Sequence, residues 1–233
     1  APDCHELLNT LTYDRTYIID LTGRTPEKIA AAMPKDGRRG VKRAERVAKE
    51  AGVVIKDETG MDRATFDEVY RVLEETSERD GFTPHSADVY WTMLTTLGEQ
   101  ARMYVARLDG RPVAWVLVTV NGISSVAYYG ASTTADRATR AAEATDWYAA
   151  CDLAAKGYKG YDFMGAGSTR VPELYGVGMY KKRFAQHPTE VDGAWDVPVQ
   201  RPVFEALVAA KKAKHLVRKA TVVAAKASEA IKR

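Results

Sequence analysis

Apolar residues recur along the chain with two different periods, and together these periods predict an α+β protein. Residues 16–21 (TYIIDL) combine β-branched and aromatic side chains, which is typical of a strand. Residues 62–79 and 86–97 carry apolar residues at three- and four-residue spacing, which is typical of amphipathic helices. Residues 137–156 predict a long alanine-rich helix that ends at Gly157.

Three segments in the middle of the chain form the strongest strand pattern. Residues 103–108 and 113–120 are joined by Asp109-Gly110, and Asn121-Gly122 leads into residues 125–129. Both dipeptides are typical of tight hairpin turns. The middle segment is almost entirely apolar, so we expect it to lie at the centre of an antiparallel meander.

Ahead of the meander the sequence predicts two helices and a short strand. Thr25-Pro26 is a helix start signal, with threonine as the N-cap and proline in the first turn, and this helix is expected to end before Pro34. Gly37-Arg38-Arg39-Gly40 is expected to lead into a second helix over residues 41–51. Residues 53–55 are then expected to form the short strand.

Charge is distributed unevenly along the chain. The net charge of the 233 residues is only +3, so the total gives no support for nucleic-acid binding. Seven Lys/Arg face two acids between residues 35 and 49, and eight face two between residues 203 and 233. The sequence therefore predicts two local basic patches, the second on a final helix that starts at Arg201-Pro202.

The first basic patch predicts an anion site on one helix face. Arg39, Lys42, Arg43 and Arg46 follow three- and four-residue spacing, so they share a face. The planar guanidinium suits phosphate, and the start of a helix also favours an anion. A solvated basic face without a ligand is the alternative that the pattern leaves open.

Residues 158–184 form the second candidate site. The alternating run 158–163 predicts a strand, and the glycines that follow it predict a loop in which backbone N–H groups can approach a ligand. The stretch closes on three consecutive cations between two aromatics, which indicates an anionic group nearby. A solvated turn is the alternative. The residues concerned are Gly165, Gly167, Gly176, Gly178 and Tyr180-Lys181-Lys182-Arg183-Phe184.

Cysteine usage and hydropathy favour a cytoplasmic protein. Cys4 and Cys151 are far apart and form neither a disulfide framework nor a zinc motif, which fits a reducing compartment. No apolar stretch is long enough to span a bilayer, and no signal peptide is expected. Since the sequence starts at Ala1, we expect a processed chain or a piece of a longer protein.

The predicted order of elements is typical of acyltransferases whose mixed, mostly antiparallel sheet splits between its fourth and fifth strands. Within that order the chain resembles the FemABX family, aminoacyl-tRNA-dependent transferases that add residues to the peptide stem of cell-wall precursors. The resemblance runs from residue 17 to residue 186. It rests on six motifs in matching order: Tyr17-Ile18-Ile19-Asp20-Leu21, Arg39-x-Val41-x-x-Ala44 with Gly52-Val53, Tyr129-Gly130-Ala131-Ser132, Lys156-Gly157-Tyr158, Tyr161-Asp162-Phe163-x-Gly165 and Gly178 to Phe184.

The resemblance implies a GNAT-like (acyl-CoA N-acyltransferase-like) α+β fold. Family members contain two such subdomains, and this chain resembles the second. We expect a lead-in over residues 1–16, a transferase domain over 17–200 and a basic C-terminal helix over 201–233. Within the matching motifs the chain departs from the family at two positions: the Phe-Lys pair reads Tyr180-Lys181, and the final Phe-Gly reads Phe184-Ala185.

The resemblance also implies a reaction, the transfer of an amino acid from aminoacyl-tRNA to an amine of a peptide-like acceptor. This acceptor is a peptidoglycan-precursor stem peptide, nucleotide- or lipid-linked, or a peptidyl antibiotic. Lys181 is the candidate catalytic residue for the developing oxyanion and the leaving ribose oxygen, and Asp162 is a weaker candidate. The candidate substrate-binding residues are Tyr180, which would stack on the terminal adenine, Arg39 and Arg43, which would hold acceptor phosphates, and Tyr129, which would orient them.

No cofactor is expected beyond the aminoacyl-tRNA co-substrate. Acetyl-CoA-dependent members of the wider fold hold the pyrophosphate with a glycine-rich turn before the central helix, and residues 132–140 contain no glycine. An acyl-CoA-dependent N-acyltransferase, or a non-catalytic half of a two-domain enzyme, is the alternative. The C-terminal helix is expected to contact tRNA or an anionic membrane surface, or to be a solubilising tail.

Overall fold

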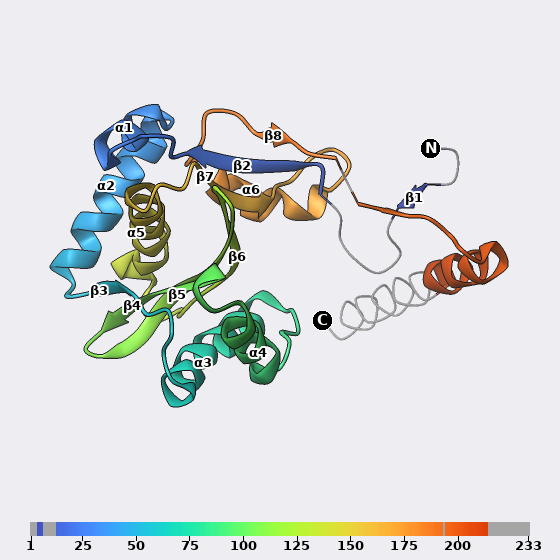
Figure 1. Ribbon diagram of the computed structural model, residues 1–233, viewed down its shortest axis with the longest axis horizontal. Coiled ribbons are helices and arrows are strands. Elements are labelled where there is room, and N and C mark those ends of the chain that lie inside the picture. The colour runs from blue at the N-terminus through green and yellow to red at the C-terminus, as the bar shows by residue number, and fades with distance from the viewer. Residues whose placement is uncertain (1–3, 7–12, 193, 214–233) are drawn as a thin grey trace, which may run out of the picture. The chain divides into compact units, whose positions relative to one another are not determined.

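The computed structural model describes residues 4–6, 13–192 and 194–213, which belong to two compact units (Figure 1). The larger unit spans residues 14–191. The smaller unit takes residues 1–13 and 192–233. Because compactness alone does not define a domain, the predicted division at residues 17 and 200 stays a prediction.

The smaller unit has little regular structure in its described part. Strand β1 (His5–Glu6) pairs antiparallel with β9 (Trp195–Asp196), and residues 201–213 are helical. The ring of His5 lies 4.8 Å from that of Phe204. The rest of the predicted C-terminal helix lies outside the described residues.

The larger unit is built on a mixed sheet of seven strands in the order β3-β4-β5-β6-β7-β2-β8. Within the described residues only the β6–β7 pair is parallel, and the other pairs of this sheet are antiparallel, which confirms the predicted fold class. The strands are β2 (Arg15–Asp20), β3 (Val54–Asp57), β4 (Ala101–Leu108), β5 (Arg111–Asn121), β6 (Ser124–Ser132), β7 (Gly160–Gly165) and β8 (Thr189–Glu190).

The predicted meander forms strands β4, β5 and β6. Asp109 and Gly110 both have positive φ, 52° and 83°, as a tight hairpin turn between right-twisted strands requires. The central strand β5 is apolar from Pro112 to Val118, and both of its faces are covered there. Trp115 packs in the cluster beneath α3 and α4, whereas Val116 packs in the cluster beneath α5.

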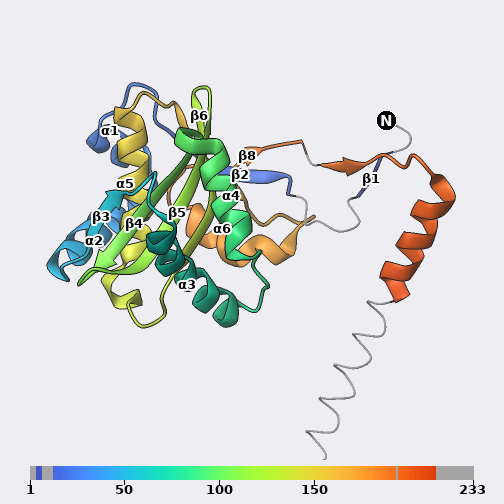
Figure 2. The same cartoon turned by 60° about the horizontal axis from the view of Figure 1, so that its bottom comes forward.

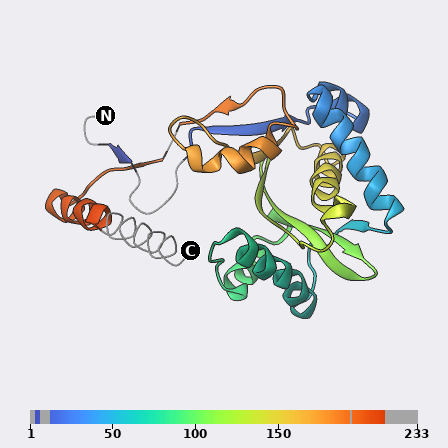
Figure 3. The same cartoon turned by 180° about the vertical axis from the view of Figure 1, so that it is seen from behind.

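Helices cover the two faces of the sheet separately, as Figures 2 and 3 show. Helices α1, α2 and α5 lie on one face and share its core. Helices α3 and α4 lie on the other. The helices are α1 (Pro26–Ala32), α2 (Lys35–Glu50), α3 (Arg63–Asp80), α4 (Ala87–Leu97), α5 (Ala141–Ala155) and α6 (Tyr175–Lys181), with single 3-10 turns at Gly98–Gln100, Arg137–Thr139 and Pro172–Leu174.

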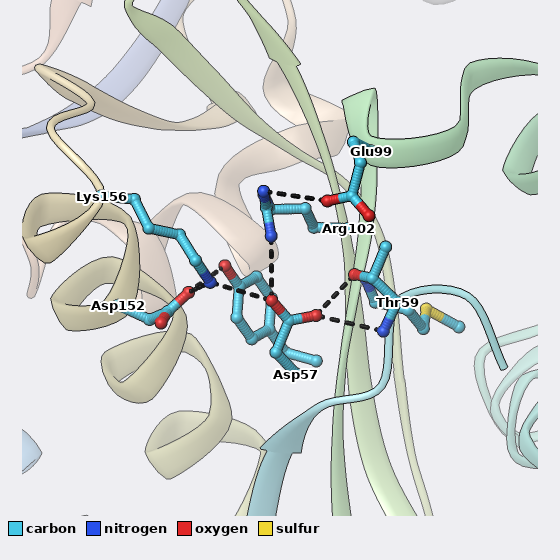
Figure 4. Close-up of polar contacts among 8 residues, drawn as sticks. Asp57, Thr59, Glu99, Arg102, Asp152 and Lys156 are labelled. Atoms are coloured by element: carbon cyan, nitrogen blue, oxygen red, sulfur yellow. Dashed lines mark hydrogen bonds and ion pairs between the residues drawn. The ribbon is translucent and has the colours of Figure 1, made fainter.

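A polar cluster ties the C-terminal end of α5 to strands β3 and β4 (Figure 4). The Asp57 carboxylate accepts from Arg102 at 3.0 Å and from Lys156 at 2.9 Å. Lys156 also contacts Asp152, which accepts from the hydroxyl of the buried Tyr104 at 2.6 Å. These groups neutralise one another across three elements, so the cluster is a structural clamp.

The prediction that α2 begins after Gly40 is wrong, because the helix begins at Lys35 and contains both Gly37 and Gly40. These two glycines are buried. A Cβ at residue 37 would lie 1.6 Å from the Arg183 carbonyl oxygen, and one at residue 40 would lie 2.8 Å from the Glu143 carboxylate. The glycines therefore allow close packing of a helix, a role that local sequence does not distinguish from a turn.

The predicted glycine loop is also shorter than expected. Strand β7 runs to Gly165, and the chain is helical again from Tyr175, so Gly176 and Gly178 lie inside α6. Gly178 is buried against the Gly167 backbone, whose nitrogen would lie 3.0 Å from a Cβ at residue 178. The loop that remains runs from Ala166 to Val171 and the 3-10 turn that follows it.

Candidate active site

The sheet opens between β6 and β7, the fourth and fifth strands of its order. The parallel pairing runs from Ser124–Gly160 to Val126–Asp162. Both strands continue beyond that point, β6 to Ser132 and β7 to Gly165, without further pairing between them in the described residues. The candidate site residues Asp162, Tyr180 and Lys181 lie at this open end, on β7 and α6.

The C-terminal end of β7 has an uncommon backbone conformation at Met164. Met164 has a φ of 60°, which is costly for a residue with a side chain. The Asp162 carboxylate accepts from the Met164 N–H at 2.7 Å and from the Thr16 hydroxyl, which also lies 2.8 Å from the Met164 carbonyl oxygen. Thr16 is fully buried. Asp162 thus stabilises the backbone conformation next to Gly165.

Lys181 lies at the end of α6, and its ammonium group contacts the backbone at the end of β7. Its Nζ donates to the Gly165 carbonyl oxygen at 2.7 Å. Within the described residues it forms no ion pair. Burial lowers its pKa to about 8, although the charges of Asp162 and Asp146 act in the opposite direction. Lys181 is therefore a partly desolvated cation with hydrogen-bonding capacity left for a ligand.

Tyr180 belongs to a buried hydrogen-bond network. Its hydroxyl donates to one oxygen of Asp146 at 2.5 Å, and the Tyr161 hydroxyl donates to the other at 2.9 Å. Burial raises the pKa of Asp146 to about 6, against the lowering effect of the two tyrosines. The Tyr180 ring packs edge-on against Phe163 and Phe184 at centroid distances of 6.3 and 5.3 Å. These contacts pack the partly buried Tyr180 against the core, and stacking on an adenine stays a prediction.

Arg39 and Arg43 lie on the exposed face of α2. Within the described residues neither side chain has a hydrogen-bond or ion-pair partner, whereas Arg46 on the same face pairs with Glu50. The first turns of α2 contact the end of α6, because Gly37 lies against the backbone of Arg183. The basic face of α2 therefore starts close to the helix that carries Lys181.

Tyr129 lies apart from the other candidates. It is on β6 and packs into the cluster beneath α3 and α4, with its ring edge-on to Tyr90 at 4.8 Å and to Tyr128 at 4.7 Å. Helix α2 covers the opposite face of the sheet. The structure therefore does not bring Tyr129 together with Arg39 and Arg43.

Several backbone N–H groups in the turn before α5 donate hydrogen bonds to acceptors within the protein. Thr134 N–H donates to Glu75, Thr139 N–H to the Asp136 carbonyl and Ala141 N–H to the Thr139 hydroxyl. The first turn of α5 holds the buried Glu143. Its carboxylate contacts Arg140 and accepts from Arg183 at 2.7 Å. An acid thus occupies the helix start, where a phosphate would otherwise bind.

Three residues of this site were missed by the sequence analysis: Thr16, Glu143 and Asp146. Thr16 was assigned only to a strand. Both acids are spaced three apart on an alanine-rich helix, and an acid on an otherwise apolar face is the one signal that could have identified them. Apart from Arg140, their partners come from residues 161–183, which no local pattern in the helix indicates.

In the described part of the chain, neither a cluster of metal ligands nor the Cys151 thiol adds a candidate site. No group of three or more His, Cys, Asp or Glu side chains is arranged there to hold a metal ion. Burial raises the pKa of Cys151 to about 12, which keeps this thiol protonated and unreactive. Among the described helices none is long and apolar enough to cross a membrane.

Comparison with known proteins identifies the fold. The profile of the family described as "Acetyltransferase (GNAT) domain" matches residues 35–182. The crystal structure of FemX is similar with a TM-score of 0.70 at 16% identity, over 82% of this chain and 63% of that chain. No curated protein sequence matches significantly.

Two further solved structures are similar over most of the chain. One is L-PGS from Bacillus licheniformis, with a TM-score of 0.59 at 14% identity, over 85% of this chain and 64% of that one. The other is the C-terminal DUF2156 domain of a candidate lysylphosphatidylglycerol synthetase from Agrobacterium fabrum, with a TM-score of 0.61 at 14% identity, over 88% and 65%. The chain thus spans less than two thirds of each of these structures.

Proposed function

From the premise that the chain belongs to the acetyltransferase (GNAT) domain family, we propose that it is a FemABX-like aminoacyltransferase that uses aminoacyl-tRNA. It would move the amino acid to an amine of a peptide-like acceptor. The observation that carries this proposal is the position of Lys181, whose ammonium lies on the Gly165 carbonyl where β6 and β7 separate.

The reaction needs a positive group more than it needs a nucleophile on the protein. The acceptor amine attacks the ester carbonyl carbon, a C–N bond forms, the bond from that carbon to the ribose oxygen breaks, and the ribose oxygen takes up a proton as the amine loses one. Negative charge develops first on the carbonyl oxygen and then on the ribose oxygen. The Lys181 ammonium would stabilise both charges by hydrogen bonding in a partly desolvated place.

The basic face of α2 supports tRNA as the donor. Arg39 and Arg43 are unpartnered cations on a helix whose start contacts the Lys181 helix, so they are placed to hold phosphates of an acceptor end that reaches Lys181. Asp162 would act indirectly, because it fixes the Met164 turn that aims the Gly165 carbonyl.

The acceptor is proposed by class only. A peptidoglycan-precursor stem peptide or a peptidyl antibiotic offers a suitable amine. The partial length of the match with FemX leaves room for an acceptor site that differs from that of the longer protein. Contact with an anionic membrane surface through the basic C-terminal segment is part of the same proposal, and a lipid acceptor is therefore included in its test.

The test is an assay of the purified chain with a pool of charged tRNAs and a panel of acceptors: a nucleotide-linked stem peptide, a peptidyl antibiotic scaffold and phosphatidylglycerol vesicles. We expect an amide product with the stem peptide or with the antibiotic scaffold. An aminoacyl ester on phosphatidylglycerol, which offers hydroxyls and no amine, would overturn the amine-acceptor part of the proposal. Lys181→Met is expected to lower the transfer rate at least about a hundredfold, while Lys182→Met, which removes the adjacent exposed lysine, keeps it within a few-fold. Transfer by Lys181→Met at the wild-type rate with tRNA binding intact would contradict the assignment of Lys181.

An acyl-CoA-dependent N-acyltransferase is the second candidate, because the matching family profile is described as an acetyltransferase domain. Two observations weigh against it: the turn before α5 donates several of its N–H groups internally, and Glu143 occupies the start of α5. Calorimetric titration with coenzyme A distinguishes the two candidates. Saturable binding followed by acyl transfer from acetyl-CoA would favour this alternative.

A further inference from the structure

The carboxylate of Asp146 joins three elements of the open end. Asp146 lies on α5, and its two oxygens accept from Tyr161 on β7 and from Tyr180 on α6. The two hydrogen bonds come from different elements, β7 and α6, which both contact this one carboxylate. Tyr161 is fully buried, so water cannot replace Asp146 as the hydrogen-bond partner of its hydroxyl.

The bond to Tyr180 sets the direction of the neighbouring Lys181. Helix α6 has only seven residues, which is too short to be stable without tertiary contacts. Successive side chains on a helix are separated by a fixed rotation of about 100°. Fixing the Tyr180 hydroxyl on α5 therefore also fixes the rotation of α6, and with it the Lys181 amine on Gly165.

The charges around the two residues complement this geometry. Lys181 is affected by Asp162 from β7 and by Asp146 from α5, and both favour its protonated form. Asp146 in turn is surrounded by the hydroxyls of Tyr180 and Tyr161, by the Lys181 ammonium and by Glu143. Glu143 is itself neutralised by contacts with Arg140 and Arg183.

We propose that Asp146 is the positioning residue for Lys181: through the Tyr180 hydroxyl it holds α6 in place, and with it the Lys181 amine on the Gly165 carbonyl. This inference rests on the proposed function in one respect only, the role of Lys181 in transfer. The hold of Asp146 on Lys181 is a property of the folded chain and is measurable without any substrate.

The chain offers a matched pair of variants. Tyr180→Phe removes the hydrogen bond from α6 to Asp146, whereas Tyr161→Phe removes the other hydrogen bond to the same carboxylate and leaves α6 attached. Asp146→Asn removes the charge and keeps an oxygen acceptor. Both tyrosine variants lose one buried hydroxyl, so they control for general loss of core stability.

The first measurement is acetylation of the Lys181 amine by acetic anhydride at neutral pH, quantified by peptide mass spectrometry with the exposed Lys182 as internal reference. Asp146→Asn is expected to raise Lys181 labelling about three- to tenfold, since one pKa unit corresponds to a tenfold change in free amine. Tyr180→Phe is expected to raise it several-fold, and Tyr161→Phe to leave it within about twofold of wild type. Equal labelling in Tyr180→Phe and Tyr161→Phe would overturn the proposal, even if Asp146→Asn does not fold.

The second measurement is the transfer assay, and it separates this inference from the proposed function. Tyr180→Phe is expected to lower kcat about tenfold with an unchanged KM for tRNA, because the ring remains and only the hold on α6 is lost. Tyr161→Phe is expected to keep kcat. If the labelling pattern is as expected but the chain shows no transfer activity, the proposed function is refuted and the role of Asp146 remains. A wild-type kcat for Tyr180→Phe would overturn that role.

Discussion

Gly37 of α2 packs directly against Arg183, whose carbonyl oxygen lies 1.6 Å from the place that a Cβ at residue 37 would take. Gly37→Ala therefore forces α2 away from the end of α6. We expect it to lower the free energy of unfolding by about 2 kcal/mol, as overpacking does in a close-packed interior. Urea unfolding followed by circular dichroism measures this loss.

Gly176→Ala is the matched control for Gly37→Ala, because Gly176 is also helical but has open space where its Cβ would be. Alanine in a helix is favoured over glycine by up to about 1 kcal/mol, so this variant is expected to be as stable as wild type or more stable. A similar loss of stability in both variants would show that helical glycine as such, and not the Arg183 contact, is responsible.

The elements of this fold were largely predictable because their signals are local. The three strands of the meander follow from β-branched runs and from Asp109-Gly110 and Asn121-Gly122, whose backbone preferences are properties of the dipeptides themselves. Glycine inside a helix has no comparable signal. Gly37 and Gly178 were interpreted as loop residues because the reason for them is a neighbour distant in sequence.

The candidate site was predictable in part for the same reason. Lys181 and Asp162 lie in one continuous stretch with the glycines of β7 and α6, so their proximity follows from the chain itself. Asp146 was not predictable, because only folding brings it to Tyr180 and Tyr161. The separation of Tyr129 from Arg39 follows from which face of the sheet each element covers, a property that only the tertiary structure fixes.

The Asp57 clamp predicts acid sensitivity of the fold (Figure 4). Burial alone would raise the pKa of the Asp57 carboxyl, but hydrogen bonds from Thr59 and Lys156 outweigh it and hold the pKa below its ordinary value. A group with a lowered pKa in the folded state contributes stability above its unfolded pKa and loses it as the pH falls through the folded value. Wild-type stability is therefore expected to decline as the pH drops below about 4.

Asp57→Asn tests this expectation. The variant is expected to lose about 1–3 kcal/mol at neutral pH, because Lys156 and Arg102 lose their charged partner. Its stability should also change less than that of wild type between neutral and acidic pH. Asp20→Asn serves as control, since Asp20 pairs with Arg24 at the surface and is expected to contribute little. Urea unfolding at several pH values makes the comparison.

The basic face of α2 predicts a salt-dependent contribution to tRNA binding. The double variant Arg39→Ala/Arg43→Ala is expected to weaken binding at least about tenfold at low salt and to reduce the slope of log K against log salt by about 1–2. Stability should not change, because both side chains are exposed and unpartnered within the described residues. Arg71→Ala, an exposed arginine on α3 across the sheet, is the control and should bind tRNA like wild type. Filter binding at several salt concentrations gives both quantities.

The lowered pKa of Lys181 predicts a basic limb in the pH dependence of transfer. The ammonium is the useful form, and it is lost as the pH rises through about 8, so the single-turnover rate is expected to fall above that pH. Lys181→Arg keeps a positive charge throughout this range and is expected to move the limb to higher pH, with a lower maximal rate because the guanidinium does not match the position of the amine. Rates are measured with charged tRNA and are corrected for spontaneous ester hydrolysis in protein-free controls. A basic limb that stays at the same pH in Lys181→Arg would assign it to a group other than Lys181.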